Sequence, residues 1–312
     1  MEKVRTLSKA LGKDLKRNWI LYLMSLPSIA LLIIFNYIPM MGQLLAFKKF
    51  TVKGGIFGSP WNGIQNFKFL FTTTDAWIIT RNTVAYNVVF IALTYVCAIA
   101  LAIALSELRS KRAAKVFQTI FIMPHFLSIA IVAIIVYAFL GTTNGFVNVV
   151  RRFFGAEKNI NWYYNVPFWP PLLVFIHLWK GVGYQAVVFL ASISGISAEY
   201  YEAAMLDGAS KMQQIRYITL PHLRSITTIL LIMAVGSIFN GDFGLFYTVT
   251  QNTGQLYPVT QVIDTYVYNA LINLNDFGRS SAAAFYQSIV GFSLVMLSNA
   301  VVRKLDPDNS LF

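Results

Sequence analysis

The chain has 312 residues, of which 56% are hydrophobic and 12% are charged, with a mean hydropathy of +0.58 and a formal net charge of +12. A typical globular chain is about 45–50% apolar and about 25% charged, so this composition excludes a soluble enzyme and a disordered chain. A disulfide scaffold is excluded because Cys97 is the single cysteine. The 25 Lys and Arg residues are spread over the connections between apolar runs, which indicates a membrane protein rather than a nucleic-acid-binding protein.

A helix needs roughly 20 apolar residues to cross the hydrocarbon core of a membrane. Six apolar runs reach or approach this length and predict an all-α polytopic membrane protein. In chain order they cover residues 19–38, 84–105, 119–140, 171–193, 226–240 and 282–302. Pro27 and Pro124 lie inside the first and third runs and predict local kinks, whereas Pro170 and Pro171 suit the first turn of the fourth helix.

The basic residues predict how the spans are oriented. An even number of spans places both termini on one side of the membrane, and the segments on that side carry fifteen Lys and Arg against nine on the other. Basic residues concentrate in cytoplasmic connections, so both termini are expected on the cytoplasmic side of a cell membrane. We therefore expect a cytoplasmic N-terminal segment 1–18, a transmembrane domain 19–302 and a cytoplasmic tail 303–312.

The connection between the fourth and fifth spans, residues 197–221, carries helix-capping signals. Ser197 fits an N-cap with Glu199 in the first helical turn, and Gly208 suits a left-handed stop at the other end. These residues predict a short helix on the cytoplasmic side of the membrane.

A second short helix is predicted directly afterwards. Ser210 and Gln213 have the spacing of a capping box, and Pro221 is expected to limit this helix. The two helices form a rigid helix-turn-helix, in which the small side chains of Ala203 and Ala204 allow another protein to approach closely.

In this same loop the sequence resembles the membrane subunits of ATP-binding-cassette importers. Their cytoplasmic loop follows the pattern E-A-A, three residues, G, nine residues, I, one residue, L-P. Every specified position is matched here, by Glu202, Ala203, Ala204, Gly208, Ile218, Leu220 and Pro221. The resemblance implies that these residues, together with Asp207, couple the chain to a cytoplasmic ATPase subunit. Ordinary surface-helix chemistry would explain the caps but not the whole pattern.

Nearly the whole chain resembles permeases of carbohydrate importers of the LplB-like class, which are related to those for maltose and alginate. The segments that carry this resemblance are residues 37–40, 46–48, 123–128, 179–183, 263–268 and 299–304. It implies a type I importer (MetI-like) architecture, complex saccharides as substrates, a second homologous permease, two ATPase subunits and an extracellular binding protein. A homodimer is the alternative to the second permease. ATP and Mg are expected to act in the ATPase subunits, with no cofactor on this chain.

The sequence lacks motifs for chemistry of its own. No G-x-x-x-x-G-K-[ST] phosphate loop occurs, so ATP hydrolysis is expected in a partner. No H-E-x-x-H or C-x-x-C motif occurs either, and His125, His177 and His222 are isolated, so no metal site is expected. The predicted spans contain no Asp or Glu, which argues against a proton- or sodium-coupled carrier.

Polar residues in two spans are candidates for the substrate pathway. Lys180 is the one charge inside a predicted span, and its alternative role is to snorkel toward the outer interface. The fifth span is short and is followed by Asn240, Asp242 and Phe243, which suit contacts with sugar hydroxyls and ring faces. An ordinary helix that ends in an outer loop is the alternative for this segment.

We expect a non-catalytic permease subunit of an ATP-driven saccharide importer that works by alternating access. A stand-alone carrier or channel for a polar solute is the alternative, and a requirement for ATP and an ATPase partner separates the two. A membrane-embedded transferase is disfavoured because no acidic pair or metal-ligand cluster lies at the end of a span.

Overall fold

The computed structural model describes residues 16–305, so most of the predicted N-terminal segment and of the predicted tail lies outside the described residues. Over residues 16–305 the chain is helical, with one isolated β-bridge between Lys48 and Trp61 and no sheet. The α-helices are α2 (Trp19–Leu32), α3 (Ile38–Met40), α4 (Gly55–Gly58), α5 (Phe69–Thr72), α6 (Thr74–Ser106), α7 (Lys111–Ile122), α8 (Ile129–Leu140), α9 (Phe146–Phe153), α10 (Trp169–Ser194), α11 (Ala198–Leu206), α12 (Lys211–Gln214), α13 (Leu220–Gly236), α14 (Tyr257–Thr260), α15 (Ile263–Tyr268) and α16 (Phe277–Leu305).

Shorter helical segments connect or extend these α-helices. The π-helical segments are Ile33–Tyr37, Ile215–Thr219, Gly244–Val249 and Asn269–Asn273. The 3₁₀ segments are Met41–Phe47, Gln65–Phe67, Met123–Phe126, Trp162–Tyr164, Val166–Phe168 and Gly254–Leu256.

Five helical stretches are long and apolar enough to cross a membrane: Trp19–Phe47, Thr74–Ser106, Val166–Ser194, Lys211–Gly236 and Phe277–Lys304. A sixth crossing requires Lys111–Phe126 and Ile129–Leu140 to act as one span, although they meet at 94°. The chain is thus an all-α polytopic protein, but the prediction of one kinked helix over residues 119–140 is wrong. The helical stretch continues through Pro124 to Phe126, and the chain turns at Leu127 and Ser128, which both have extended backbone. Pro27 lies inside α2, which continues through it.

The fifth predicted span is wrong in its length and in its start. Residues 226–240 suggested a short helix, whereas the structure has a continuous stretch of 26 residues, Lys211–Gly236. Pro221 therefore does not limit the helix that begins after Ser210. The π-helical segment Ile215–Thr219 lies immediately before α13, and its wider turn accommodates a proline nitrogen that has no hydrogen to donate.

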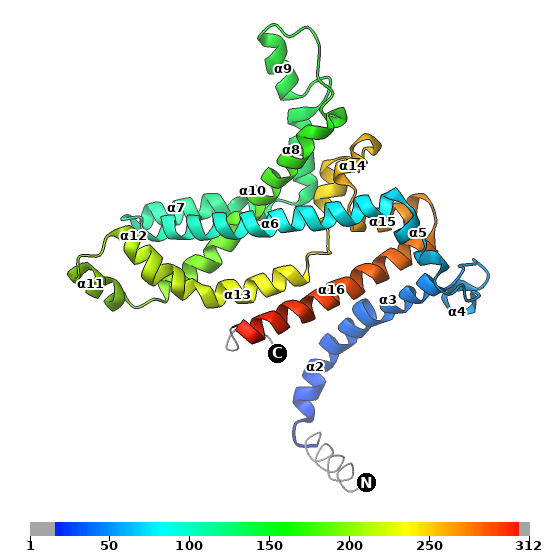
Figure 1. Ribbon diagram of the computed structural model, residues 1–312, viewed down its shortest axis with the longest axis horizontal. Helices are drawn as coiled ribbons and strands as arrows, with labels where there is room; N and C mark the ends of the chain where they lie inside the picture. Colours follow the sequence, from blue (N-terminus) through cyan, green and yellow to red (C-terminus); the bar gives the residue numbers. More distant parts are fainter. Residues whose placement is uncertain (1–15, 306–312) are drawn as a thin grey trace.

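The body of the molecule is built around α6, which packs most extensively along α10. Ala98 and Ala102 of α6 share a buried cluster with Ala186 of α10, and such small side chains let two helices approach closely. A second cluster joins Ile79 of α6 to Ala283 of α16. Helices α6, α13 and α16 run across this body, and α11 lies at the end away from α4, α5 and α15 (Figure 1).

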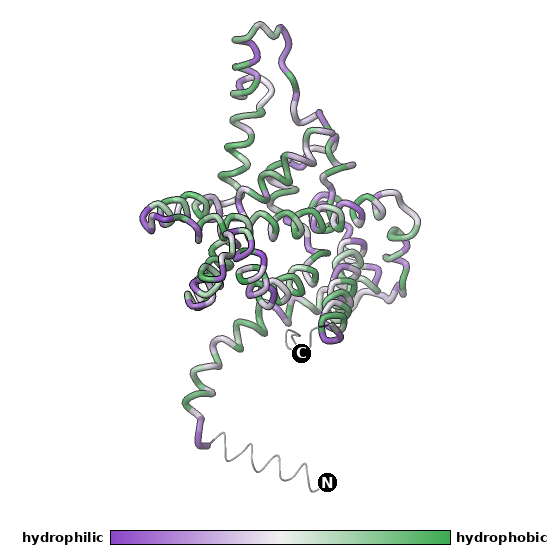
Figure 2. The backbone as a smooth tube through the Cα atoms, turned by 60° about the vertical axis from the view of Figure 1, so that its left-hand side comes forward, coloured by the Kyte–Doolittle hydropathy of each residue, from purple (hydrophilic) through white to green (hydrophobic). Residues whose placement is uncertain are grey.

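Two parts of the chain extend from this body. The stretch Trp19–Phe47 has no buried residue before Leu45, and α8 and α9 together form an arm (Figure 1). Apolar residues predominate along the helices, whereas hydrophilic residues gather in the connections and at helix ends (Figure 2). Exposed apolar helix surfaces of this kind suit a lipid environment or contact with another membrane chain.

Candidate functional site

The loop over residues 197–221 folds into the two helices that its caps predict. The Ser197 hydroxyl accepts a hydrogen bond from the amide of Glu199 at 3.3 Å and starts α11. Gly208 follows α11 with φ +79°, the left-handed conformation in which glycine avoids the cost of a Cβ atom. Ser210 and Gln213 form the predicted capping box, with distances of 3.4 and 2.7 Å. Both caps and the glycine stop are confirmed.

The loop is tied to the body but leaves its outer surface free. The hydroxyls of Tyr201 and Thr219 lie 3.0 Å apart and join α11 to the helix that follows. Lys211 and Glu107 form an ion pair of 2.9 Å between the start of α12 and the end of α6. Leu206, at the end of α11, is 90% exposed.

The eight residues singled out in this loop lie along its surface. Ala204 and Ile218 are half-buried, while the others are exposed: Glu202, Ala203, Asp207, Gly208, Leu220 and Pro221. Exposed apolar side chains accompany them, namely Tyr200, Met205, Leu206, Met212 and Tyr217. An apolar set of this size on a rigid helix pair is typical of a surface that binds another protein.

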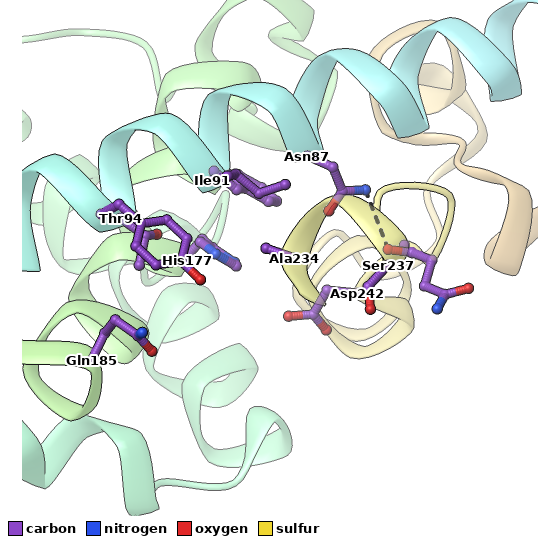
Figure 3. A pocket seen from close by; sticks show the side chains of 12 residues that line it. Asn87, Ile91, Thr94, His177, Gln185, Ala234, Ser237 and Asp242 are labelled. Carbon is purple, nitrogen blue, oxygen red and sulfur yellow. Dashed lines mark hydrogen bonds between the residues drawn. The ribbon is translucent and has the colours of Figure 1, made fainter. Parts of the chain in front are cut away.

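A cavity of about 330 Å³ lies beside the C-terminal end of α13. It is bounded by α6, α10, the end of α13 and the segment that follows α13. Its polar lining residues are Asn87, Thr94, Tyr95, His177, Gln185, Ser237, Asn240 and Asp242 (Figure 3). Hydroxyl, amide and imidazole groups predominate, so the cavity offers many hydrogen-bonding groups and few charges.

Asn240 and Asp242, both predicted from the sequence, are brought together in this cavity with side chains that the sequence did not indicate. The amide of Asn87 donates to the carbonyl oxygen of Asn240 at 3.2 Å (Figure 3). One carboxylate oxygen of Asp242 accepts from the amide of Leu245 at 3.0 Å, which caps the next helical segment. His177 stacks face to face on Phe90 with ring centroids 3.9 Å apart.

Two polar groups in the cavity wall have no partner among the described residues. The hydroxyl of Thr94 and the side-chain nitrogen of Gln185 are buried atoms with no hydrogen bond within the protein. Buried polar groups are nearly always paired with protein or water, so these two groups are available to a polar ligand.

Phe243 does not line this cavity. It belongs to a group of three aromatic rings with Tyr247 and Tyr268, whose centroids are 4.8 to 5.0 Å apart. Tyr268 keeps 36% of its surface exposed. Phe243 and Tyr247 follow the cavity segment directly in the chain, whereas Tyr268 joins them from the end of α15.

Lys180 also lies outside the cavity. Its ammonium group donates to the carbonyl oxygen of Leu127 and lies 3.4 Å from that of His125. These carbonyls belong to the break between α7 and α8, where the helical hydrogen bonds are interrupted. The structure therefore gives the Lys180 ammonium group two backbone partners, while its roles in the substrate pathway and at the interface stay predictions.

A glycine three residues after Lys180 sets how closely α10 packs against α7. A Cβ atom on Gly183 would lie 1.8 Å from the carbonyl oxygen of Phe121, so α10 can approach α7 this closely only with glycine. Gly181 has open space around it.

The sequence reasoning missed Asp264 and Gln287. Asp264, in α15, accepts a hydrogen bond from the amide of Gly241, and the side-chain nitrogen of Gln287 lies 3.2 Å from the Asp264 carboxylate. Burial raises the pKa of Asp264, while the hydrogen bonds from Gly241 and Gln287 oppose that rise. A carboxylate in the otherwise uncharged segment Ile263–Tyr268 was the signal that could have revealed it.

The three histidines lie in separate surroundings. His125 stacks on Tyr184 and His177 on Phe90, while His222 hydrogen-bonds the carbonyl oxygen of Ile218. Within residues 16–305 no three His, Cys, Asp or Glu side chains come together as a metal site.

Comparison with known proteins places this architecture in a family. Residues 95–309 match the family model described as the binding-protein-dependent transport system inner membrane component. The polygalacturonan/rhamnogalacturonan transport system permease protein YteP of Bacillus subtilis is 34% identical over 91% of this chain and 88% of its own length. The protein LplB of the same organism is 32% identical over 94% of this chain and 92% of its own length.

A solved structure shows the same fold over nearly the whole chain. It belongs to a bacterial ABC transporter that imports the acidic polysaccharide alginate, and the match has a TM-score of 0.85 and 31% identity. The matched region covers 95% of this chain and 99% of the other. With its capped helix pair over residues 197–221, its long apolar helices and the sharp bend between α7 and α8, this chain belongs to the family of binding-protein-dependent transport system inner membrane components and has the architecture of an ABC importer permease.

Proposed function

We propose that this chain is the permease subunit of an ATP-driven importer of oligosaccharides. It forms the translocation pathway together with a second homologous permease, and two cytoplasmic ATPase subunits drive it through the 197–221 loop. The observation that carries this proposal is the continuous helix Lys211–Gly236, which joins that loop directly to the polar cavity. A helix of 26 residues is about 39 Å long and transmits displacement from one end to the other.

The exposed face of the loop supports the role in coupling. Leu206 projects fully from the end of α11, and Glu202 and Ala203 lie exposed on the same short helix. The Gly208 turn fixes the angle between α11 and α12, so the two helices present one rigid surface. An ATPase subunit that holds this surface can push or pull the long helix, with both termini and the loop on the cytoplasmic side.

The nature of the cavity supports a saccharide as the substrate. Sugars present many hydroxyl groups, and the unpaired groups of Thr94 and Gln185 suit them. The side chains of Asn240 and Asp242 add further hydrogen-bonding groups. Relatives are named for transport of polygalacturonan or rhamnogalacturonan, trehalose and maltose, and lactose, and one neighbouring structure contains a periplasmic protein bound to an alginate pentasaccharide. An external binding protein is accordingly expected to deliver the substrate.

Site-specific crosslinking tests the coupling. In a Cys97→Ala background, Ala203→Cys should crosslink to a cytoplasmic ATPase subunit that co-purifies with the chain. Asn159→Cys, also exposed but in the predicted outer connection, is the matched control and should not crosslink to that subunit. Absence of any ATPase from the purified complex would contradict the proposal.

Uptake measurements test the substrate pathway through the cavity and distinguish an ATP-driven importer from a stand-alone carrier. Membrane vesicles that contain the assembled transporter should accumulate oligosaccharide only when ATP is supplied. Asn240→Leu and Asp242→Leu should reduce that uptake while the complex still assembles. Uptake driven by an ion gradient without ATP would support a carrier or channel instead.

A further inference from the structure

The segment that follows α13, residues 237–242, is held by side chains from other parts of the fold; we call it the pocket loop. Its residues Ser237, Asn240, Gly241 and Asp242 line the cavity, and it has no regular helix of its own. An irregular segment needs partners for its backbone groups, and those partners decide where it lies. The position of this loop therefore depends on its anchors.

Gln287 of α16 is the first anchor. Its side-chain nitrogen lies 2.9 Å from the carbonyl oxygen of Phe239 and 3.0 Å from the side-chain oxygen of Asn240. The same nitrogen lies 3.2 and 3.3 Å from the two carboxylate oxygens of Asp264. One amide group thus joins the pocket loop, α15 and α16.

Asp264 of α15 is the second anchor. Its carboxylate accepts the hydrogen bond from the Gly241 amide, and charged acceptors of this kind make the stronger hydrogen bonds in proteins. A Cβ atom on Gly241 would lie 2.8 Å from the Asp264 carboxylate and 2.7 Å from the Val262 side chain. The loop is therefore seated directly against this carboxylate, and a larger residue at 241 would require the side chains of Val262 and Asp264 to shift.

Neither anchor is part of the cavity wall. Asp264 and Gln287 are absent from the residues that line the cavity, whereas the loop they hold supplies four of them. They stand on α15 and α16, while the opposite end of the loop is continuous with the helix Lys211–Gly236. The loop therefore lies between the end of that helix and its own contacts with α15 and α16, so a displacement of the helix relative to those contacts changes the loop.

We infer that Asp264 and Gln287 are positioning residues that seat the pocket loop, so that movement of the helix Lys211–Gly236 reshapes the cavity instead of carrying the loop along as a loose segment. This inference rests on the proposed coupling of the 197–221 loop to an ATPase. What it adds is that Asp264 and Gln287 hold the pocket loop, so that displacement of one helix changes the shape of the substrate pathway.

Hydrogen exchange measured by mass spectrometry tests this inference without any saccharide. The complete transporter in lipid nanodiscs is compared without nucleotide and with ATP plus vanadate, which traps the ATPase subunits. The variants are Asp264→Leu, Gln287→Leu and the milder Asp264→Asn, whose side-chain oxygen can still accept from Gly241. Asp276→Asn is the matched control. The carboxylate of Asp276 forms an ion pair of 3.2 Å with Arg279 and makes no hydrogen bond with the pocket loop within residues 16–305.

We expect residues 237–243 of Asp264→Leu and Gln287→Leu to exchange roughly tenfold faster or more than wild type, since a hydrogen bond to a charged group is lost. Asp264→Asn should show a smaller increase, and Asp276→Asn none. ATP plus vanadate should alter exchange at residues 237–243 in wild type but not in Asp264→Leu. A merely stabilising contact would lower the unfolding temperature without abolishing this nucleotide response.

Two outcomes overturn the inference in distinguishable ways. If residues 237–243 exchange as in wild type in both leucine variants, in both states, the seat does not hold the loop. If Asp264→Leu fails to assemble, exchange at residues 237–243 in Asp264→Asn and Gln287→Leu is compared with wild type instead, and wild-type exchange in both variants overturns the inference. If wild type shows no nucleotide response at residues 197–210, the proposed coupling itself fails, and the inference fails with it.

Discussion

At the scale of single residues, glycine is required where the backbone is left-handed or where a neighbouring atom occupies the space of a Cβ atom. Gly208 and Gly183 require glycine for opposite reasons. Gly208 has φ +79° and open space around it, so a side chain there costs backbone strain alone. Gly183 has an ordinary helical backbone but no space for a Cβ atom. Substitution of Gly208 therefore tests backbone strain in the loop over residues 197–221, whereas substitution of Gly183 tests packing between helices.

Replacement of Gly208 by valine should uncouple the transporter while leaving the chain folded. The left-handed conformation costs a residue with a Cβ atom about 1–2 kcal/mol, so the angle between α11 and α12 should change. ATP hydrolysis stimulated by the binding protein and substrate uptake should fall together. Gly181→Ala is the control, because a Cβ there meets nothing within 4 Å. Uptake at the wild-type rate in Gly208→Val would contradict this role.

Replacement of Gly183 by alanine should destabilise the helix bundle. The added Cβ would collide with the carbonyl oxygen of Phe121, and overpacking of this kind costs about 1–3 kcal/mol. The measurement is the thermal unfolding midpoint of the purified chain in detergent, compared with Gly181→Ala. Equal midpoints for the two variants would show that α7 and α10 can separate without cost.

At the scale of elements, the broken third span depends on a side chain from its neighbour. The chain turns between Phe126 and Ile129, and Lys180 of α10 donates to the carbonyl oxygens of His125 and Leu127 beside this turn. A buried acceptor without a partner is costly, so the lysine and the break form one unit.

Lys180→Met should therefore lower stability rather than substrate affinity. Loss of the ammonium donor should cost about 1–3 kcal/mol in the free energy of unfolding. Lys180→Arg keeps a donor of similar reach and should retain most of the stability. Unfolding midpoints and the concentration dependence of uptake distinguish the two effects. If Lys180→Met unfolds as wild type but requires much more substrate, the lysine belongs to the pathway after all.

At the scale of the whole molecule, the open prediction is the orientation of the chain in the membrane. Helix α13 leads from the side that bears α11 toward the middle of the body, and α16 runs from the far end near α15 toward the C-terminus (Figure 1). The side of the membrane on which α11 lies stays a prediction from the basic residues.

Labelling of single cysteines in intact cells tests this orientation. In a Cys97→Ala background, Lys53→Cys and Asn159→Cys should react with a membrane-impermeant thiol reagent, whereas Ser8→Cys and Ser310→Cys should not. Permeabilised cells provide the control, because all four positions should react there. External labelling of either terminal cysteine would reverse or abolish the predicted topology.

The features that could be predicted from the sequence are those that depend on neighbouring residues in the chain. Apolar run length predicted the membrane helices, since the requirement to satisfy backbone groups in lipid acts on each segment separately. Cap chemistry predicted both ends of α11 and the capping box at Ser210, because these hydrogen bonds join residues only two or three positions apart. The loop motif predicted the family for the same reason, as its spacing lies within twenty residues of chain.

Tertiary structure alone decided the features that join distant segments. The 94° bend between Phe126 and Ile129 depends on where α8 packs and on Lys180, which is more than fifty residues away in the chain. The passage of a helix through Pro221 depends on a π-helical turn that cap and proline rules do not predict. Asp264 and Gln287 meet the pocket loop only after α16 packs against α13 and α15 packs against α16. Sequence patterns report what a residue requires of its own segment, whereas these contacts follow from the side chains that other segments bring to it.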